Sequence, residues 1–308
     1  MNIDLKTTLE VSIIIVNYNT SNLINSCIES IFKMTSGVKY EIIIVDNATE
    51  DLSNTIYNAR DSRVKLVQLT KNIGFGLANN EGFKIARGRN IFCLNPDTII
   101  INNAIRILSN YLDEHPEVGA CGGNLYDEDM KPTLSFRRIF PGIFWELNEL
   151  LHLLPERIIF GKNSRFNSSD KPFEVSYITG ADLMLRHEVA KAIGGFSKEF
   201  FMYYEETDLC KRITKMGYKI VSVPSAIIQH LEGRSFGDSE FNKGRIERSE
   251  RGRCIYYRRN NSKLNRLISN GIYKLFLYSR ITITQNIQFT YRIECLKAFS
   301  KNKKLTGY

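Results

Sequence analysis

Residues 11–20 read VSIIIVNYNT, a run of β-branched residues that ends in polar ones. The run is apolar without alternation, and this predicts a strand over Val11–Asn17 that is buried on both faces. Thr20 or Ser21 is a typical N-cap residue, and apolar residues then recur at helical spacing as far as Phe32, which predicts a helix. A buried strand followed by a helix is the unit from which parallel sheets are built.

The same alternation of strand and helix repeats along the chain. Further strands are expected at Glu41–Asp46, Val64–Leu69 and Asn90–Asn95, and further helices at Leu52–Ala59, Gly76–Ala86 and from Asn102 or Asn103 to about Glu114. Later elements are expected as a helix at Ile143–Leu154, a strand at Val175–Leu185, helices at Glu188–Ile193 and Thr207–Met216, and a strand at Lys219–Val223. We therefore expect an α/β fold with a mostly parallel sheet and helices on both faces. Residues 126–174 carry four prolines and are expected to be mostly loop.

Charge divides the 308 residues into two parts. Residues 241–308 hold 16 basic and 3 acidic residues, a net of +13, so the rest of the chain carries −4 of the overall +9. This predicts one domain over residues 1–236 and a basic, mostly helical extension over 237–308. The charge belongs to the extension and no aromatic-interleaved RNA signature accompanies it, so we do not expect a nucleic acid partner.

The extension contains a candidate amphipathic helix. Its apolar positions are Leu264, Leu267, Ile268, Ile272, Leu275 and Phe276, and its basic positions are Lys263, Arg266, Lys274 and Arg280. Two interpretations stay open: an ordinary helix packed on the domain, or a helix that docks peripherally on an anionic membrane surface.

Targeting and cysteine patterns indicate a cytoplasmic protein. The N-terminus has acidic residues before its apolar run and no small-residue cleavage site, and no apolar run approaches the ~18 residues of a membrane span. The six cysteines are scattered, without the spacing of a disulfide framework or a structural zinc site.

Polar residues follow three of the predicted strands at their carboxyl ends, where ligands bind in open α/β sheets. They are Asn17, Tyr18 and Asn19 at the end of the first strand, Asp46 at the end of the second, and Asn95 and Asp97 at the end of the fourth. Asp46 can accept hydrogen bonds from a nucleobase or a ribose hydroxyl. Asp97 suits a divalent cation bound to phosphates, since Mg²⁺ is usually held by one or two carboxylates plus phosphate oxygens. Each carboxylate taken alone could instead cap a helix or turn.

Residues 71–82 form a glycine-containing loop that opens a helix and includes Asn72, Gly74 and Asn80. Its glycines allow close approach of a ligand, and the helix N-terminus favours anions. The first strand is followed by no glycine, which excludes the dinucleotide-binding fingerprint, and no G-x-x-x-x-G-K-[ST] occurs, which excludes a P-loop NTPase.

Three acids within four positions precede another amphipathic helix. Glu205 and Glu206 follow the aromatic run Phe200–Tyr204, and carboxyls beside apolar rings can have a raised pKa and act as general bases. Asp208 is expected to cap the helix. A lone histidine is more often a structural residue, but His230 follows a strand and precedes a glycine-containing loop, which strengthens the alternative of a ligand role.

The ordered motifs together resemble family 2 glycosyltransferases with a GT-A fold, especially their rhamnosyltransferase-like branch. Over about residues 10–236 the motifs are VSIIIVNYN, IIIVDNAT, NIGFGLANNEG, LNPD, TGADLMLR, GGFSKEFFMYYEETDLCKR and HLEGRS. The resemblance implies inverting transfer of a sugar from a nucleotide-sugar donor with Mg²⁺ or Mn²⁺.

The resemblance also implies roles for individual residues. Asp97 and His230 match metal or diphosphate ligands, and Glu206 matches the general base, with Glu205 as the alternative. The donor is expected to contact Asn17, Tyr18, Asn19, Asp46, Asn72, Gly74, Asn80, Asn95, Asp97, Gly180, Ala181 and Asp182. The sequence departs from the family pattern twice: Asn95 stands where the first carboxylate of D-x-D is usual, and Glu206 stands where Asp is usual.

The branch resemblance implies dTDP-rhamnose as donor, with UDP-hexoses as the alternative. The implied acceptor is a cell-surface glycan or a polyprenyl-linked saccharide, which fits a basic extension that touches the inner face of the membrane. The rival interpretation is a catalytically inactive protein of the same fold that binds nucleotide or glycan. Residues 126–174 or the loop Gly233–Gly237 could close over the donor.

Overall fold

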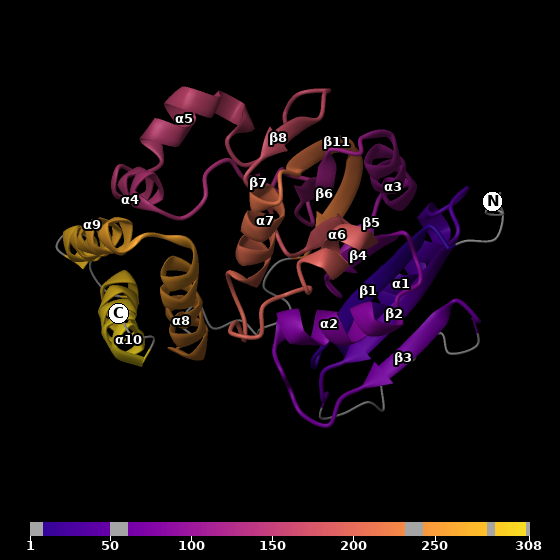
Figure 1. Cartoon of the computed structure of the whole chain (residues 1–308), viewed down its shortest axis with the longest axis horizontal. Coiled ribbons are helices and arrows are strands. Elements are labelled where there is room, and N and C mark those ends of the chain that lie inside the picture. Colours follow the sequence, from indigo (N-terminus) through magenta and orange to yellow (C-terminus); the bar gives the residue numbers. More distant parts are fainter. Residues whose placement is uncertain (1–8, 50–60, 232–242, 282–286, 306–308) are drawn as a thin grey trace.

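The computed structural model describes residues 9–49, 61–231, 243–281 and 287–305. The predicted helix at Leu52–Ala59 and the loop Gly233–Gly237 therefore lie outside the described residues. Within those ranges a nine-stranded sheet forms the centre of the molecule, with strand order β3-β2-β1-β4-β10-β6-β11-β5 and β8 paired to β11 (Figure 1). The strands are β1 (Val11–Asn17), β2 (Tyr40–Asp46), β3 (Val64–Gln68), β4 (Asn90–Leu94), β5 (Thr98–Ile100), β6 (Val118–Tyr126), β8 (Phe173–Val175), β10 (Asp182–Arg186) and β11 (Lys219–His230).

The first half of the sheet is parallel, as the sequence predicts. Strands β1, β2, β3 and β4 pair in parallel, and β6 pairs in parallel with β11. The second half is mixed, because β10 runs antiparallel to both β4 and β6, and β5 and β8 run antiparallel to β11. A second, two-stranded sheet joins β7 (Phe136–Arg137) to β9 (Tyr177–Ile178).

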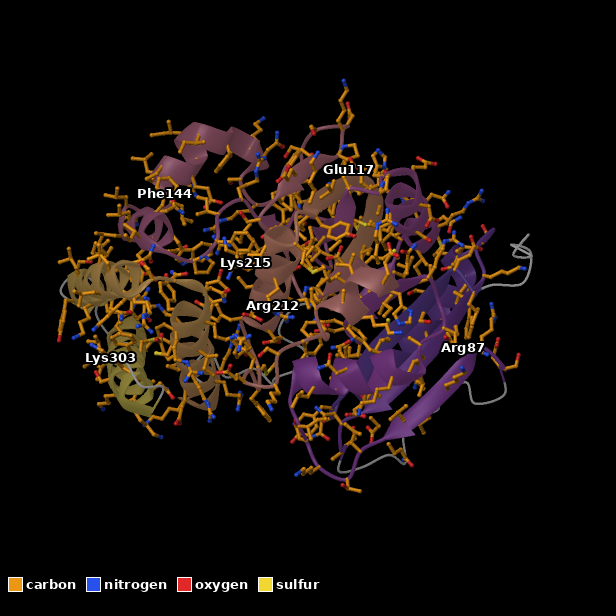
Figure 2. All side chains as sticks on the ribbon, viewed as in Figure 1. Arg87, Glu117, Phe144, Arg212, Lys215 and Lys303 are labelled. Atoms are coloured by element: carbon orange, nitrogen blue, oxygen red, sulfur yellow. The ribbon has the colours of Figure 1, made fainter. Side chains whose placement is uncertain are left out.

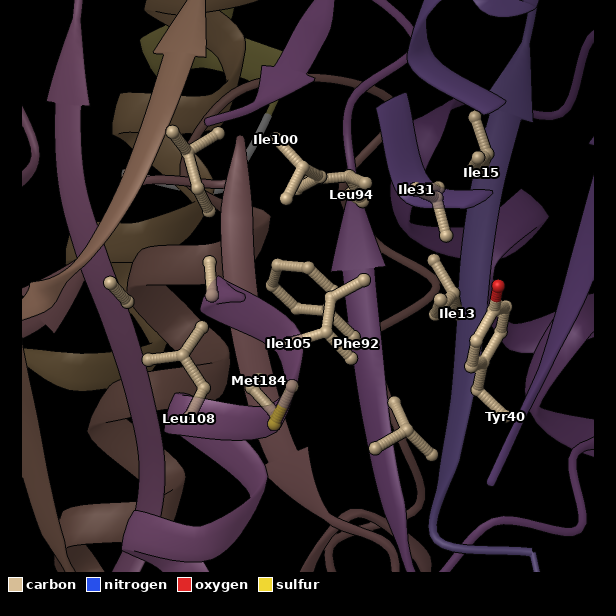
Figure 3. Close-up of a cluster of buried hydrophobic side chains, with 14 of the residues drawn as sticks. Ile13, Ile15, Ile31, Tyr40, Phe92, Leu94, Ile100, Ile105, Leu108 and Met184 are labelled. Carbon is tan, nitrogen blue, oxygen red and sulfur yellow. The ribbon is translucent and has the colours of Figure 1, made fainter. Parts of the chain in front are cut away.

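Helices cover both faces of the sheet, as predicted. The helices of the described residues are α1 (Ser21–Met34), α2 (Phe75–Ile85), α3 (Ala104–Glu114), α4 (Ile143–Leu150), α5 (Leu154–Phe160), the 3₁₀ turn η1 (Gly161–Asn163), α6 (His187–Ala192), α7 (Glu205–Lys215), α8 (Lys243–Asn260), α9 (Lys263–Ile281) and α10 (Ile287–Leu305). Helices α1 and α3 pack on one face, where Ile13, Phe92 and Leu108 belong to one buried cluster (Figure 3). Helices α2, α6 and α7 pack on the other face.

Two predicted elements differ from those observed. The expected strand Val175–Leu185 is divided among β8, β9 and β10, and the expected helix Ile143–Leu154 ends at Leu150. His152 and Leu153 have left-handed backbone, with φ of 56° and 64°, and α5 begins beyond them. Two short helices therefore stand where one was expected.

The predicted helical extension is present in the described part of residues 237–308 as α8, α9 and α10. Helix α8 packs against α7 and contributes Tyr256 and Tyr257, both fully buried, to a cluster with Phe200. Helix α9 packs on α4, and α10 packs on α8 and α9 (Figure 1). The division at residue 236 stays a prediction. In the described part of the chain no helix is long and apolar enough to cross a membrane.

Candidate functional site

The carboxyl ends of β1 and β2 bring Asn17 and Asp46 together. The two residues are partners in the parallel register, and the Asn17 side-chain amide donates to Asp46 Oδ1 at 3.0 Å. The same amide donates to Thr49 Oγ1 at 3.0 Å, and Thr20 Oγ1 donates to Asn17 Oδ1 at 2.7 Å. Thr20 thus supports the strand end rather than capping α1 through its side chain. The buried Asp46 carboxylate is held in a fixed orientation.

Tyr18 and Asn19 continue this strand end toward solvent. Tyr18 is exposed, and Asn19 has left-handed backbone with φ of 55°. The Asn19 N–H donates to Thr49 Oγ1 at 3.3 Å, so one threonine ties the turn after β1 to the segment after β2. An aromatic ring in this position offers a face on which a nucleobase can stack.

Asn47 connects the end of β2 to the loop with Asn72 and Gly74. Asn47 Nδ2 donates to Asn72 Oδ1 at 3.0 Å, and the Ile73 N–H donates to Asn47 Oδ1 at 2.9 Å. Asn72 Oδ1 also accepts from the Gly74 N–H at 2.9 Å. Sequence reasoning omitted Asn47 from the candidate residues, although its place directly after Asp46 at a strand end was a usable signal.

The loop after β3 then approaches the aromatic segment before α7. Gly74 has φ of +89°, and a Cβ there would lie 2.2 Å from the Phe201 carbonyl oxygen, so only glycine fits. The Phe75 N–H donates to the same carbonyl at 3.0 Å. This contact brings residues 72–75 next to the segment that carries Glu205 and Glu206.

Asp97 and His230 face each other across two strands. The antiparallel register pairs His230 on β11 with Thr98 on β5, and Asp97 immediately precedes Thr98. Asp97 Oδ1 lies 3.3 Å from His230 Nε2, and the Asn95 side-chain nitrogen lies 3.5 Å from the same ring atom. Three residues that are up to 135 positions apart therefore meet at one point, as the ligand interpretation of His230 requires.

The Asp97–His230 pair fits a divalent cation. Two adjacent ligands of an octahedral ion at ~2.1 Å are about 3 Å apart, close to the observed separation of Oδ1 and Nε2. Among the described residues no group of three or more His, Cys, Asp and Glu side chains could hold a metal ion. Two protein ligands with the remainder from phosphate and water is the arrangement that Mg²⁺ accepts.

Glu205 and Glu206 stand at the start of α7 beside this rim. Burial raises the pKa of both carboxyls, and for Glu205 the neighbouring Glu206 raises it further. Thr207 Oγ1 donates to Glu206 Oε1 at 3.0 Å. A Cβ on Gly180 would lie 3.5 Å from the Phe75 ring and 3.9 Å from Glu206 Cβ, so Glu206 faces the turn before β10. Glu205 faces Gly76 and Phe196 instead, because a Cβ on Gly76 would lie 3.4 Å from Glu205 Cβ.

Ala181 ends the turn that leads into β10, and Asp182 is the first residue of that strand. The Ala181 carbonyl accepts the Asn95 N–H at 3.0 Å, which fixes the turn against the Asn95–Asp97 segment. Asp182 is fully buried, its Oδ2 accepts the Gly123 N–H at 2.6 Å, and burial raises its pKa well above the ordinary value. Its direct contact with a donor stays a prediction.

Asn80 lies on α2, and its side-chain amide forms two hydrogen bonds with the backbone of Phe196. Asn80 Nδ2 donates to the Phe196 carbonyl and the Phe196 N–H donates to Asn80 Oδ1, both at 2.8 Å. The structure does not bring this side chain to the group around Asp97. A role for Asn80 in donor binding stays a prediction.

The prediction that Asp208 caps α7 is wrong. No side-chain cap hydrogen bond is formed at that end of the helix, and Asp208 is fully buried. Its Oδ2 accepts from Arg212 Nε at 2.8 Å, and its Oδ1 accepts from Arg259 at 3.2 Å and Asn260 at 2.9 Å. Charge pairing with α8 therefore takes the place of a cap, because burial of this carboxylate requires cationic partners.

Helix α8 also supports the segment that leads into Glu205. Tyr203 and Tyr204 both have left-handed backbone, with φ of 72° and 69°, a conformation that costs a non-glycine residue about 1 kcal/mol or more. The Tyr204 ring packs on Tyr256, 5.8 Å between centroids. A Cβ on Gly252 would lie 2.5 Å from the Tyr203 carbonyl oxygen. The extension is thus in direct contact with the segment that positions the two glutamates.

Comparisons with known proteins identify the family of the chain. The family model described as glycosyl transferase family 2 matches residues 12–194. A Mycobacterium tuberculosis protein named N-acetylglucosaminyl-diphospho-decaprenol L-rhamnosyltransferase is 26% identical over 217 residues, which are 64% of this chain and 68% of that protein. Glu205, Glu206 and His230 lie beyond the range of the family match, so their assignment depends on the geometry described above.

Solved structures of low sequence identity share the fold. The crystal structure of S. aureus TarS in complex with UDP-GlcNAc has a TM-score of 0.58 at 16% identity and covers 96% of this chain and 80% of that one. A mannosyltransferase from Pyrobaculum calidifontis in complex with GDP-Man and Mn²⁺ has a TM-score of 0.55 at 14% identity and covers 97% and 84%. Since the family match extends over more than half of the chain, the protein belongs to glycosyl transferase family 2 and is a glycosyltransferase of GT-A fold.

Proposed function

We propose that this glycosyltransferase moves a sugar from a nucleoside-diphosphate donor to a hydroxyl group of a lipid-linked saccharide, with inversion at the anomeric carbon. The observation that carries the proposal is the 3.3 Å approach of Asp97 Oδ1 and His230 Nε2 at the rim where Asp46 and Glu206 also lie. The rhamnosyltransferase relative favours dTDP-rhamnose as donor and a polyprenyl-diphosphate saccharide as acceptor. A UDP-hexose is the alternative donor.

On the donor side, Asn17 and Asp46 would bind the nucleoside. The Asp46 carboxylate is already oriented by the Asn17 amide, so it loses little conformational freedom when it accepts a hydrogen bond from a base or ribose. Asp97 and His230 would hold Mg²⁺ or Mn²⁺, whose positive charge would stabilise the negative charge that develops on the departing diphosphate. Asn95, in place of a second aspartate, leaves one carboxylate and one imidazole for this task.

On the acceptor side, Glu206 would remove the proton from the attacking hydroxyl. A raised pKa makes its carboxylate a stronger base, and the Thr207 hydroxyl orients one of its oxygens. Glu206 faces Gly180, where the absence of a side chain leaves room for a sugar, whereas Glu205 faces the packed side of α2. We therefore place the base at Glu206, whose pKa is raised by burial, and assign no proton transfer to Glu205.

We place the catalytic unit in residues 1–236, with 237–308 as a helical extension. The protein would work from the cytoplasmic side, at the surface where a lipid-linked acceptor is presented.

The test is a thermal-shift series with dTDP, UDP and GDP, each with and without Mn²⁺. A ligand present at ~100 times its Kd adds about 2.7 kcal/mol of stability, which should raise Tm by roughly 5 °C. We expect metal-dependent stabilisation by dTDP or UDP in the wild type, and its loss in Asp97→Ala and Asp97→Asn. Asp129→Ala is the matched control, because that carboxylate is exposed and pairs only with Lys131 among the described residues.

The second arm follows the anomeric configuration of the product by NMR. Stabilisation that survives in both Asp97 variants, or retention of configuration, would contradict the proposal. If no nucleoside diphosphate raised Tm, the inactive-protein interpretation would replace it.

A further inference from the structure

Helix α9 exposes many large apolar side chains to solvent, although it also buries some against the protein. Its solvent-facing side carries Leu264, Leu267, Ile268, Leu275 and Tyr278, all exposed, with Leu264 at 66% and Leu267 at 69%. Its inward side buries Leu277 together with the polar residues Ser269 and Asn270, and Asn270 Oδ1 accepts a hydrogen bond from Arg253 at 3.1 Å. A helix whose only partner is the domain buries its apolar face, so the exposed apolar face of α9 indicates another partner.

Helices α4 and α5, with the connection between them, also expose large apolar side chains. These are Phe144, Leu147, Leu151, Leu154, Ile158 and Ile159, with Ile158 at 74% and Leu151 in the connection. Their polar residues point inward instead: the buried Glu146 accepts from Arg253 at 2.7 Å, and the buried Asn148 donates to Glu156 at 2.9 Å. The inward polar groups fix which side of each helix faces out.

The two sets of exposed apolar side chains lie at one end of the molecule. Helix α4 packs against both α5 and α9, and the three helices occupy the end farthest from β3 (Figure 1). Figure 2 labels Phe144 at this end. We call the exposed apolar residues of α4, α5 and α9 the apolar end surface.

The exposed charged residues on the helices that form the apolar end surface have one sign. Among the residues of α4, α5, α9 and η1 whose exposure is described, they are Arg157, Lys162, Lys263 and Lys274, all basic. The acidic residues of α4 and α5 are turned inward: Glu146 pairs with Arg253, and Glu149 and Glu156 lie near Arg137 and Arg165. Apolar side chains flanked by cations match the outer layer of an anionic bilayer, which offers acyl chains bordered by negative headgroups.

We propose that the apolar end surface docks the enzyme on an anionic lipid bilayer, with the side chains of α4, α5 and α9 inserted at the level of the headgroups. The surface is therefore made jointly by the extension and by two helices of the preceding domain, whereas the sequence places membrane contact in the extension alone. The proposal rests on the proposed function, since a lipid-linked acceptor is what requires this position.

Helix α4 connects the apolar end surface to the base. Trp145, on the inner side of α4, lies 6.5 Å from Tyr177 between ring centroids. Tyr177 is buried, and burial raises the pKa of its hydroxyl. The nearby Glu206 raises this pKa further, whereas a hydrogen bond with Thr207 lowers it. The surface that would dock on the bilayer is thus linked through Trp145 and Tyr177 to the part of the site that holds Glu206.

The experiment is cosedimentation with vesicles, in the absence of donor. Wild-type protein should sediment with vesicles of phosphatidylcholine and phosphatidylglycerol, and more weakly with phosphatidylcholine alone. Ile158→Gln combined with Leu267→Gln should reduce the partition coefficient by about tenfold or more, because two aliphatic side chains no longer leave water. Lys263→Gln and Lys274→Gln should each reduce binding to the anionic vesicles by roughly fivefold.

Leu66→Gln combined with Met216→Gln is the matched control, since both residues are exposed apolar side chains on β3 and at the end of α7, away from this surface. All variants change exposed residues, and each should keep the wild-type nucleotide thermal shift, so a failure of docking is distinct from a failure of the proposed function. Wild-type protein that stays in the supernatant, or an Ile158/Leu267 variant that sediments like wild type, would overturn the proposal. So would a dimer in solution that this variant dissociates, because the occupant would then be a second copy of the chain.

Discussion

The free energy of unfolding of the wild-type protein should fall as pH rises, and replacement of Glu250 by glutamine should make this fall smaller. Glu250 lies on α8 and is buried against α9, where the Tyr273 hydroxyl donates to Oε1. Its other oxygen, Oε2, has no hydrogen-bond partner among the described residues. Burial raises the pKa of Glu250 to about 7, and the nearby Arg253 guanidinium only partly opposes this shift.

The magnitude follows from the difference between the folded and unfolded pKa. The pKa rises from 4.5 to about 7, and each unit corresponds to about 1.4 kcal/mol, so the ionised carboxylate costs the folded state about 3 kcal/mol. Because the folded pKa is the higher one, the stabilisation is fully present below pH 4.5 and is lost as pH rises through 7. Glutamine stays neutral and can still accept the tyrosine hydrogen bond. The free energy of unfolding should therefore depend less on pH in Glu250→Gln, by about 2 to 3 kcal/mol between pH 5 and pH 8.

Urea denaturation followed by far-UV circular dichroism at the two pH values measures this difference. Glu247→Gln is the matched control, since Glu247 lies on the same helix with half of its side chain exposed and pairs with Lys301. The control should keep the wild-type pH dependence. If Glu250→Gln and wild type lost the same free energy between pH 5 and pH 8, the carboxyl would not be desolvated in the way described, and the reasoning would be refuted.

Three further predictions concern the site. Gly252→Ala should lower kcat by about tenfold and leave the nucleotide thermal shift unchanged. The new Cβ would lie only 2.5 Å from the Tyr203 carbonyl oxygen, so the segment before Glu205 would have to move; unchanged steady-state kinetics would contradict this. Asn47→Ala should raise the donor KM by roughly tenfold at similar kcat, since it removes two hydrogen bonds that shape the loop at Asn72, and a purely kcat effect would argue against it. Glu206→Gln should lower kcat by about 10²- to 10⁴-fold and Glu205→Gln by much less, and the reverse order would move the base to Glu205.

The parallel half of the sheet and its rim were predictable because the sequence patterns that specify them lie within single short segments. Strands β1, β2 and β4 are buried on both faces and read as continuous apolar runs, and the polar residues at their ends mark the rim. Asn17, Asp46 and Asp97 could be placed there without knowledge of contacts. The meeting of His230 with Asp97 could be suspected but not located, because it depends on the register of β11 against β5.

Strand β6 could not be predicted, because its sequence carries Gly119, Gly122 and Gly123, and glycine is depleted in strands. The reason for the glycines is close packing from both sides. A Cβ on Gly122 would lie 2.4 Å from Ile178, and one on Gly123 would lie 2.5 Å from the Ala226 carbonyl. Such contacts come from segments that are distant in sequence and leave no local signal.

The extension shows a related limit. Its periodicity predicted a helix, which α9 confirms, but not which side of that helix faces inward. Leu264 and Leu267 are exposed because Asn270 and other polar groups meet Arg253 and Glu146 in the interior. The error at Asp208 has the same origin, since Arg259, one of its partners, comes from 51 positions along the chain.

The chain passes without interruption from α7 into β11, with the proposed base at the beginning of this unit and His230 at its end. One continuous helix and strand thus sets the spacing between the group that would activate the nucleophile and the group that would assist the leaving diphosphate. The nucleoside side of the site is instead assembled from separate loops after β1, β2 and β3. An engineer who wished to change the donor base would have to vary these loops together, because Thr49 and Asn47 bond them to one another, and would keep Gly74, which contacts Phe201. An insertion inside α7 or β11 would alter this spacing for every donor at once.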